Sequence, residues 1–158
     1  MVQMKFIGNG GHARVIRDLL CGVSLSKMVE WTVIAVGDNA ARKREAGAHA
    51  GERFPELIHS GAYVGRMVSI GEGTVIMAGA VVQPGAVIGR FCILNTGCSV
   101  DHDCVLGDFV HIAPGAHLCG NVRVGEGALV GVGVGVAPGA VIPAWSLVKA
   151  RRLEICQP

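Results

Sequence analysis

Charged and aromatic residues are scarce in this chain, and their scarcity excludes several classes of function. Only 16% of the 158 residues are charged, the formal net charge is +2, and aromatic residues make up 4%. The scattered Lys and Arg side chains form no basic stripe, and there is no series of aromatic rings on which bases could stack. Nucleic acid is therefore not expected as a partner of this chain, which is about one ordinary domain long.

The six cysteines lack the Cys-x-x-Cys spacing that is typical of zinc and redox sites. Cys92, Cys98 and Cys104 instead follow one another at intervals of six residues, and Cys21 and Cys156 lie near the two ends of the chain. We predict reduced thiols that pack as small hydrophobic side chains. A metal site built from the three regularly spaced cysteines is the alternative.

No stretch of the sequence reads as a membrane helix or a signal peptide. Residues 127–148 carry no charge and are long enough to cross a bilayer, but Pro138 and Pro143 would break a helix there. We expect no membrane association and a cytoplasmic location. A segment with so little charge favours a face that is buried against another subunit.

A strict six-residue repeat dominates the rest of the sequence. Every sixth position from Ile58 is aliphatic: Ile58, Val64, Ile70, Ile76, Val82, Ile88, Leu94, Val100, Leu106, Ile112, Leu118, Val124, Val130, Val136, Ile142 and Val148. This period fits neither a helix near 3.6 residues nor a simple strand of period 2. It is typical of a parallel β-solenoid, in which the chain returns to the same geometric role with every hexapeptide.

Two further columns complete the repeat. The residue four positions after each aliphatic one is mostly Ala, Cys or Val, which indicates a second inward-facing position. Three positions after each aliphatic residue, Gly or Asn recurs, from Gly61 to Gly139, where a corner of the solenoid can demand positive φ. Each hexapeptide is thus one short strand and one corner, and three of them make a triangular coil of eighteen residues.

The first 57 residues read as a small, truncated Rossmann-like βαβα domain. We expect strands at residues 5–7 and 31–36, helices at 13–20 and 40–48, and a glycine-rich turn at 8–12. The β-helix then occupies residues 58–148, and residues 149–158 form a tail. The turn presents a helix N-terminus that suits an anion. As a dinucleotide fingerprint Gly8-x-Gly10-x-x-Ala13 is incomplete, because Glu30 precedes the second strand; a turn that merely packs strand on helix is equally open.

Histidine spacing on the solenoid identifies candidate catalytic residues. His102 and Gly120 are eighteen residues apart, so they should stack on one corner about 4.8 Å apart. Such a pair suits acyl transfer, in which the imidazole takes a proton from the acceptor and a backbone amide stabilises the oxyanion. Asp103 can orient the ring or raise its basicity. His102 and His111 are half a coil apart, so they can meet only between subunits of a three-fold assembly.

There are two alternative interpretations of these histidines. Either one can be an ordinary surface residue. A zinc site like that of the carbonic anhydrases of this fold is a poor fit, because no two solenoid histidines are five, eighteen or thirty-six residues apart. We therefore expect no metal.

Three segments together resemble a known family. They are Ile7-Gly8-Asn9-Gly10-Gly11-His12-Ala13, Val36-Gly37-Asp38-Asn39-x-x-Arg42, and residues 94–122 with Val100-Asp101-His102-Asp103-Cys104 and His111-Ile112-Ala113-Pro114-Gly115. This pattern resembles the hexapeptide-repeat sugar acyltransferases, which include the sialic acid O-acetyltransferases and the UDP-amino-sugar N-acetyltransferases. The likeness covers most of the chain.

The resemblance implies a homotrimer of left-handed β-helices that uses acetyl-CoA, with a nucleotide sugar held by the N-terminal domain. By this likeness His102 is the general base and Asp103 its acidic neighbour. The implied coenzyme contacts are His111, Gly120 and Val132. The implied acceptor contacts are Gly10, Gly11, His12 and Asn95.

The sequence departs from that family in two places. The family has a further strand, with acidic residues, where this chain has only residues 21–30, and the usual C-terminal Gly-x-Pro-Ala-Lys is replaced by Lys149-Ala150-Arg151-Arg152. We predict an acetyltransferase that acts directly on an amino or hydroxyl group of a sugar. The alternative is a catalytically weakened trimeric binding or scaffold protein of the same fold.

Overall fold

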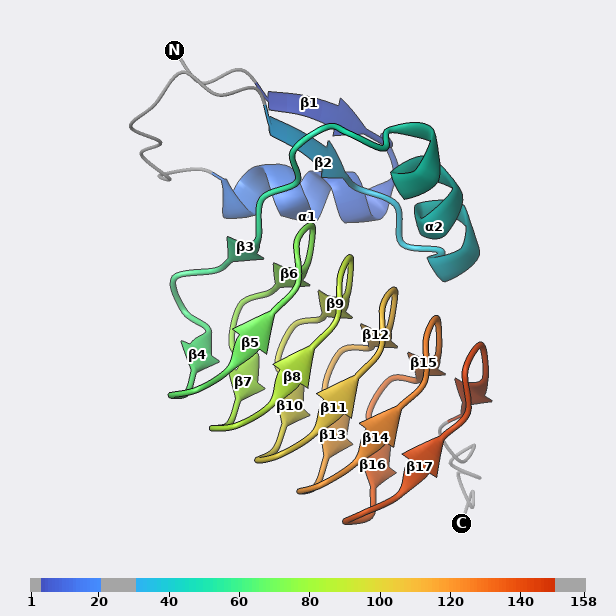
Figure 1. The fold of residues 1–158 in the computed structure, drawn as a ribbon. Coiled ribbons are helices and arrows are strands. Elements are labelled where there is room, and N and C mark those ends of the chain that lie inside the picture. The colour runs from blue at the N-terminus through green and yellow to red at the C-terminus, as the bar shows by residue number, and fades with distance from the viewer. Residues whose placement is uncertain (1–3, 21–30, 150–158) are drawn as a thin grey trace, which may run out of the picture.

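The computed structural model describes residues 4–20 and 31–149, which form a small α/β domain seated on a β-helix (Figure 1). The predicted contents of residues 21–30 and of the tail beyond residue 149, including Cys21, Cys156 and the basic pair Arg151 and Arg152, lie outside the described residues. No described helix has the length and apolar character that crossing a membrane requires.

The N-terminal domain has the predicted βαβα order. Strand β1 (Met4–Ile7) pairs in parallel with β2 (Trp31–Ile34), in register from Met4↔Trp31 to Ile7↔Ile34. Helix α1 (Gly11–Leu19) follows β1, and α2 (Asn39–Ala48) follows β2. Helix α1 begins two residues earlier than predicted, because Gly10 serves as its N-cap and the glycine-rich turn ends there. Strand β2 is two residues shorter than predicted.

One face of each helix fixes the domain to the solenoid. Ala13, Ile16 and Leu19 of α1 are buried in a cluster that also contains residues of β2 and of the first solenoid coils. The Asp38 side chain caps α2 by accepting a hydrogen bond from the Ala41 amide at 2.7 Å. Ala46 of α2 packs in a second cluster with Phe54, Phe91 and Phe109.

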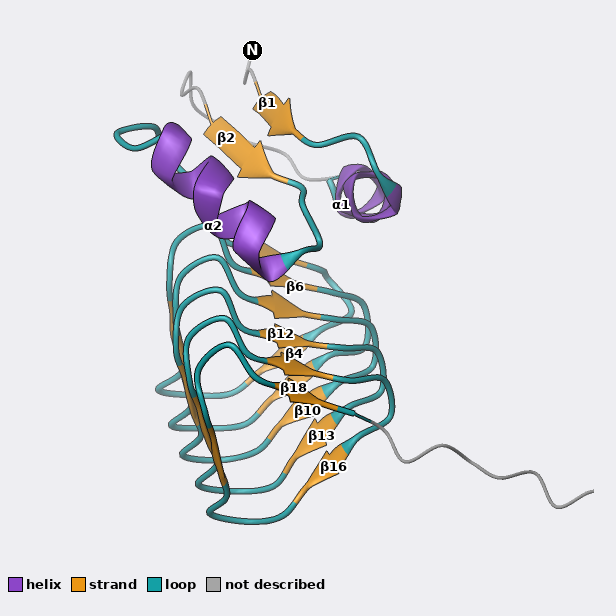
Figure 2. Ribbon diagram, turned by 90° about the vertical axis from the view of Figure 1, so that its right-hand side faces the viewer, coloured by secondary structure: helices purple, strands orange, loops and turns teal. Residues whose placement is uncertain are grey.

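The solenoid is a left-handed parallel β-helix of two-residue strands, as predicted. The strands are β3 (Leu57–Ile58), β4 (Tyr63–Val64), β5 (Ser69–Ile70), β6 (Val75–Ile76), β7 (Val81–Val82), β8 (Val87–Ile88), β9 (Ile93–Leu94), β10 (Ser99–Val100), β11 (Val105–Leu106), β12 (His111–Ile112), β13 (His117–Leu118), β14 (Arg123–Val124), β15 (Leu129–Val130), β16 (Gly135–Val136), β17 (Val141–Ile142) and β18 (Leu147–Val148). They form three parallel sheets, with orders β16-β13-β10-β7-β4, β17-β14-β11-β8-β5 and β18-β15-β12-β9-β6-β3. Figure 2 shows the coils stacked as a prism below the N-terminal domain.

The eighteen-residue coil predicted from the repeat is confirmed by the strand register. Ser99 pairs with Val81 on one side and with His117 on the other. The aliphatic column fills the core together with the small column that contains Cys92, Cys98 and Cys104. Ile58 differs from this pattern, because it is 41% exposed. Its strand β3 ends a sheet, so no preceding coil covers it.

The backbone conformation of the corners also repeats every six residues, including at corners that have no glycine. Every sixth residue from Met67 to Trp145 has positive φ, including the non-glycine residues Met67, Phe91, Asp103, Phe109, Asn121 and Trp145. Gly61 was predicted to share this conformation, but it is not among the residues with positive φ. At Gly73 a Cβ atom would overlap the Phe91 ring of the next coil. Glycine there lets an aromatic corner side chain lie flat on the coil before it.

Candidate functional site

His102 and Asp103 occupy the corner between β10 and β11. The His102 ring nitrogen Nδ1 lies 2.8 Å from Oδ2 of Asp103, and both side chains are exposed. Asp103 has a φ of 58°, a left-handed conformation that Asp tolerates better than most residues. The hydrogen bond to Asp103 is the main cause that raises the pKa of His102. When Nδ1–H donates to this carboxylate, Nε2 keeps the lone pair that a general base needs.

Gly120 lies against that lone pair on the next coil, as the eighteen-residue spacing predicts. A Cβ atom at Gly120 would be 2.6 Å from Nε2 of His102, so only glycine leaves room for the ring in this position. The Asn121 amide donates to the His102 carbonyl at 3.0 Å and keeps the two corners in register. Among hydrogen bonds between described residues, the Gly120 amide takes part in none.

A second group of predicted residues lines a cavity at the carboxyl ends of β1 and β2. The cavity has a volume of about 410 Å³, and its lining residues are Gly8, Asn9, Gly10, Gly11, His12, Ala35, Val36 and Gly37. This is the edge of a parallel sheet where ligands bind in open α/β folds. The structure therefore brings Gly10, Gly11 and His12 together, as predicted.

Glycine occurs at positions 8 and 10 of this turn for different physical reasons. A Cβ atom at Gly8 would lie 2.6 Å from the Ala35 carbonyl oxygen, and φ there is 110°, so Gly8 is required by packing. Gly10 has no atom within 4 Å of its Cβ position. Packing thus accounts for Gly8 but leaves open space beside Gly10, at the N-terminus of α1, where a ligand can approach the backbone closely.

His111 and Asn95 meet on the solenoid face below this cavity. The Asn95 side-chain oxygen accepts from the Thr96 amide at 2.8 Å, which orients the Asn95 Nδ2 group toward His111 Nε2 at 3.1 Å. Because an amide nitrogen only donates, Nε2 must accept and the proton of a neutral His111 must reside on Nδ1. The backbone of Gly37 is a second hydrogen-bond partner of His111.

Burial, with the nearby Arg42 charge as the second cause, lowers the pKa of both His12 and His111 to about 4. Both rings are therefore neutral at neutral pH and act as hydrogen-bonding groups rather than as cations. Among the described side chains, His12 Nε2 is the buried polar atom that has no hydrogen-bond partner. That nitrogen is available to a molecule in the cavity.

Within one chain, the His102 corner and the residues around His111 lie apart. His102 follows β10, whereas His111 is part of β12 in a different sheet. Val132, assigned to the coenzyme, is 64% exposed in the turn that follows β15, the strand that pairs with the His111 strand β12. Within the chain, Asn95 contacts His111 directly, although the sequence assigned these two residues to different ligands.

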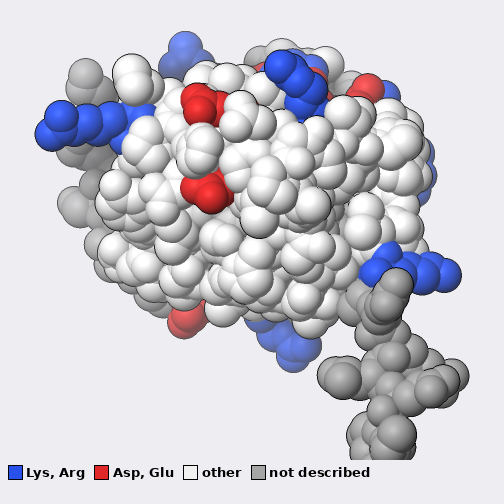
Figure 3. All heavy atoms as spheres, turned by 90° about the horizontal axis from the view of Figure 1, so that it is seen from below, with Lys and Arg blue, Asp and Glu red and all other residues white. Residues whose placement is uncertain are grey.

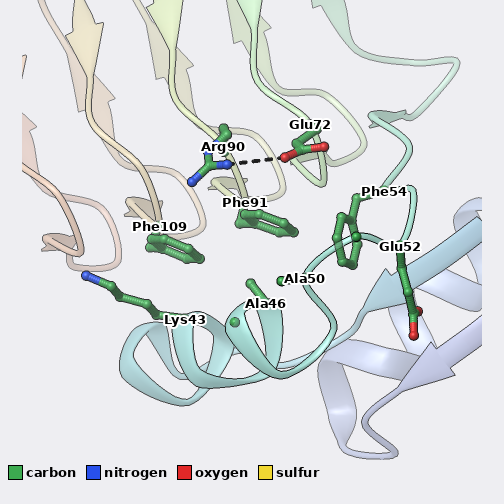
Figure 4. A pocket seen from close by; sticks show the side chains of 11 residues that line it. Lys43, Ala46, Ala50, Glu52, Phe54, Glu72, Arg90, Phe91 and Phe109 are labelled. Carbon is green, nitrogen blue, oxygen red and sulfur yellow. Dashed lines mark hydrogen bonds and ion pairs between the residues drawn. The ribbon is translucent and has the colours of Figure 1, made fainter.

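A further cavity of about 340 Å³ lies on the other side of α2, where Phe54, Phe91 and Phe109 approach it from the loop before the solenoid and from two corners (Figure 4). It shares no lining residue with the first cavity. Arg90 at its rim is paired with Glu72 at 3.3 Å and with Asp108 at 3.2 Å.

The regularly spaced cysteines belong to the core and not to a site. Cys92, Cys98 and Cys104 are buried and unpaired. Burial raises the pKa of Cys92 and of Cys98 to about 12, so their thiols stay protonated. This confirms the prediction that they pack as small hydrophobic side chains. Cys119 is exposed.

Sequence reasoning gave no role to Arg42 or Gly37, both of which act on the pKa of His111. They are part of the Val36-Gly37-Asp38-Asn39-x-x-Arg42 segment, so the motif was visible in the sequence. An arginine on a short helix is usually exposed. Its complete burial at the junction of two domains could be found only from the structure.

Comparisons with known proteins agree with this architecture. Residues 67–102 and 103–138 match the family described as bacterial transferase hexapeptide (six repeats). The UDP-N-acetylbacillosamine N-acetyltransferase of Bacillus subtilis (strain 168) is 38% identical over 113 residues, a match that covers 49% of this chain and 52% of that protein. The chain thus matches about half the length of this curated relative.

Two solved structures match over nearly the whole chain. One is the acetyltransferase domain of PglB from Neisseria gonorrhoeae FA1090 in complex with acetyl coenzyme A, with 33% identity, a TM-score of 0.83, and coverage of 92% of this chain and 86% of that one. The other is PerB from Caulobacter crescentus in complex with CoA and GDP-perosamine, with 35% identity, a TM-score of 0.83, and coverage of 92% and 84%. The chain therefore belongs to the hexapeptide-repeat sugar acetyltransferases.

Proposed function

We propose that this protein transfers an acetyl group from acetyl-CoA to an amino group of a nucleotide-linked sugar. The observation that carries the proposal is the His102 corner, where the Asp103 carboxylate holds Nδ1 of the ring and Nε2 lies so close to Gly120 that a Cβ atom there would be 2.6 Å from it. Relatives that bind acetyl-CoA, CoA or GDP-perosamine support the same class of substrates.

The proposed chemistry is a direct transfer without an acyl-enzyme. The acceptor nitrogen attacks the thioester carbonyl and forms the new C–N bond, while His102 Nε2 takes the proton that this nitrogen loses. The Gly120 amide donates to the oxyanion of the tetrahedral intermediate. The C–S bond then breaks, and the CoA thiolate leaves and takes up the proton from the His102 imidazolium.

We further propose that the working unit is a homotrimer in which His111 of one subunit approaches the thioester bound beside His102 of the next. The separation of His102 and His111 within one chain supports this arrangement. So does the underside of the solenoid, where only a few charged side chains interrupt an uncharged surface (Figure 3). Several apolar solenoid side chains are exposed in the single chain: Tyr63, Met67, Val87 and Val141. A shared interface would bury such residues.

The acetyl transfer itself is tested with acetyl-CoA labelled in the acetyl group and a panel of amino sugars linked to UDP, CMP and GDP. We expect one labelled acetyl group on the product and one equivalent of free CoA thiol. The described lining of the Gly10 cavity has no Asp, Glu, Lys or Arg and no Phe, Tyr or Trp side chain to bind a nucleobase. We therefore expect competition by UDP, CMP and GDP to differ little, with phosphate contacts dominating.

Two variants sharpen this test. His12→Ala should raise the KM of the acceptor more than that of acetyl-CoA, while His59→Ala, at a distant turn, should change neither. Binding of acetyl-CoA without transfer to any acceptor would favour the scaffold alternative. Inhibition tens of times stronger by one nucleotide would show that a base pocket exists.

Subunit complementation tests the shared site. His102→Ala and His111→Ala chains are each expected to be nearly inactive, because every site in either trimer lacks one histidine. When the two are refolded together in equal amounts, about a quarter of the sites receive both histidines by random assortment, and activity should rise toward that fraction. Sedimentation of the wild-type chain as a trimer is the accompanying measurement. A fully active monomer, or no recovery in verified mixed trimers, would contradict the arrangement.

A further inference from the structure

Arg42 is completely buried between the N-terminal domain and the β-helix, with 1% of its surface exposed. All five N–H groups of its guanidinium are matched by five hydrogen bonds. Nε donates to the Phe91 carbonyl at 2.8 Å, and Nη2 donates to the Phe109 carbonyl at 2.9 Å. Nη1 donates to the Val36 and Gly37 carbonyls at 3.1 and 3.0 Å. Nη2 also donates to the Asn39 side chain at 2.8 Å.

These partners belong to both parts of the molecule. Val36 and Gly37 form the loop between β2 and α2, whereas Phe91 and Phe109 are corners of successive solenoid coils. Asn39 extends the network, because its Nδ2 group donates to the Gly127 carbonyl of a third coil at 3.0 Å. The Phe91 and Phe109 rings stack outside this network with centroids 5.3 Å apart (Figure 4).

Packing alone does not explain a charge in this position. Within residues 4–20 and 31–149, Arg42 forms no ion pair with a carboxylate, and burial lowers its pKa only to about 10, so it stays cationic at neutral pH. Burying an unpaired charge is unfavourable, and an apolar side chain of similar volume would join the two surfaces at lower cost. A planar fork of five donors supplies what an apolar side chain lacks, a fixed geometry for several carbonyls at once.

Two of the carbonyls that Arg42 holds, those of Val36 and Gly37, belong to residues that line the candidate acceptor cavity. Val36 and Gly37 line the cavity beside His12, and the Gly37 backbone is a partner of His111. Phe109 precedes His111 by two residues. Arg42 therefore holds both the Gly37 loop and the Phe109 corner, the two backbone segments next to His111.

We propose that Arg42 is a positioning residue of the acceptor site, whose guanidinium fixes the Val36–Gly37 loop against the solenoid and so sets the place of the bound sugar relative to His111. This inference rests on the proposed acetyl transfer. It assigns Arg42 no contact with substrate and no part in the proton transfer.

The same placement has an electrostatic consequence. The charged and titratable groups that act on the His111 pKa are Arg42 from α2 and His12 from α1, and the Arg42 charge also lowers the pKa of His12. Arg42 thus helps to keep both rings neutral. Its loss should raise the pKa of His111 from about 4, but not to the ordinary value, since burial is the larger cause.

The test compares Arg42→Lys and Arg42→Met with Arg44→Met, a control on the exposed side of the same helix. Lysine keeps the charge but has a single nitrogen, which cannot span the five acceptors. We expect both Arg42 variants to raise the acceptor KM at least tenfold, with the acetyl-CoA KM within about twofold of wild type. His111 should titrate at higher pH in Arg42→Met than in Arg42→Lys, as measured by NMR without substrates.

The outcomes separate this inference from the proposed function. If no acceptor is acetylated by the wild type, the proposed function fails, while the His111 titration still reports whether Arg42 acts on that ring. If transfer occurs but Arg42→Lys leaves the acceptor KM unchanged, the positioning role is overturned. Equal increases in both KM values with an unchanged His111 titration also overturn it, because they indicate a general structural effect. Should Arg42→Met fail to fold, Arg42→Lys decides the question alone, with guanidinium rescue of Arg42→Ala as a second readout.

Discussion

Replacing His102 with alanine is expected to lower kcat by about 10²- to 10⁴-fold, the usual effect of removing a general base. The fold should be unaffected, because the side chain is exposed at a corner and contributes nothing to the aliphatic core. Steady-state kinetics with acetyl-CoA and a nucleotide-linked amino sugar measure the effect. Circular dichroism and the thermal midpoint serve as the check on folding.

Asp103→Asn distinguishes a base from a simple contact residue. Asparagine tolerates the left-handed backbone of this position, so the corner should keep its shape. Removing the carboxylate takes away the main cause that raises the pKa of His102. The acid limb of the pH profile of kcat/KM should therefore move to lower pH, with a reduced plateau.

An unchanged kcat/KM in His102→Ala would exclude His102 as the base.

The solenoid could be predicted almost completely from the sequence, because its repeat is a local rule that each hexapeptide obeys. Strand positions, coil length and the stacking of His102 on Gly120 all follow from the periods of six and eighteen. The exceptions lie where the repeat ends or changes its residue type. Ile58 loses its cover at the first coil, and Phe91 adopts the corner conformation without being glycine.

The seam between the two domains could not be predicted in the same way. Arg42 and Phe91 are 49 residues apart, and their hydrogen bond depends on how α2 sits on the solenoid. No periodicity encodes that docking. The sequence likewise could not show that His111 contacts Asn95 and the Gly37 backbone, or that His12 has a buried, unpartnered nitrogen. Contacts of this kind arise from tertiary packing, and they set the geometry of the part of the candidate site that would bind the acceptor.

The His102 corner also depends on the absence of a side chain at Gly120, and Gly120→Ala tests that dependence directly. The added Cβ atom would lie 2.6 Å from Nε2 and 2.7 Å from Cε1 of the His102 ring, which is closer than such atoms can approach. His102 is exposed, so its ring can rotate away at little cost in stability. The base would then point away from the acceptor nitrogen whose proton it has to take.

We expect kcat in Gly120→Ala to fall by about 10- to 100-fold through this misplacement alone, with the thermal midpoint nearly unchanged. Gly135→Ala is the matched control, because its Cβ position is in open space, its φ is not positive, and it lies on the same sheet as β13. A crystal structure of Gly120→Ala should show the His102 ring turned away from the next coil. If the ring stays in place and activity is retained, the close approach of His102 to Gly120 is not required for transfer. If activity falls while the ring stays in place, the loss must come from the Gly120 amide itself, because the added methyl group then restricts the approach of the thioester carbonyl to that donor.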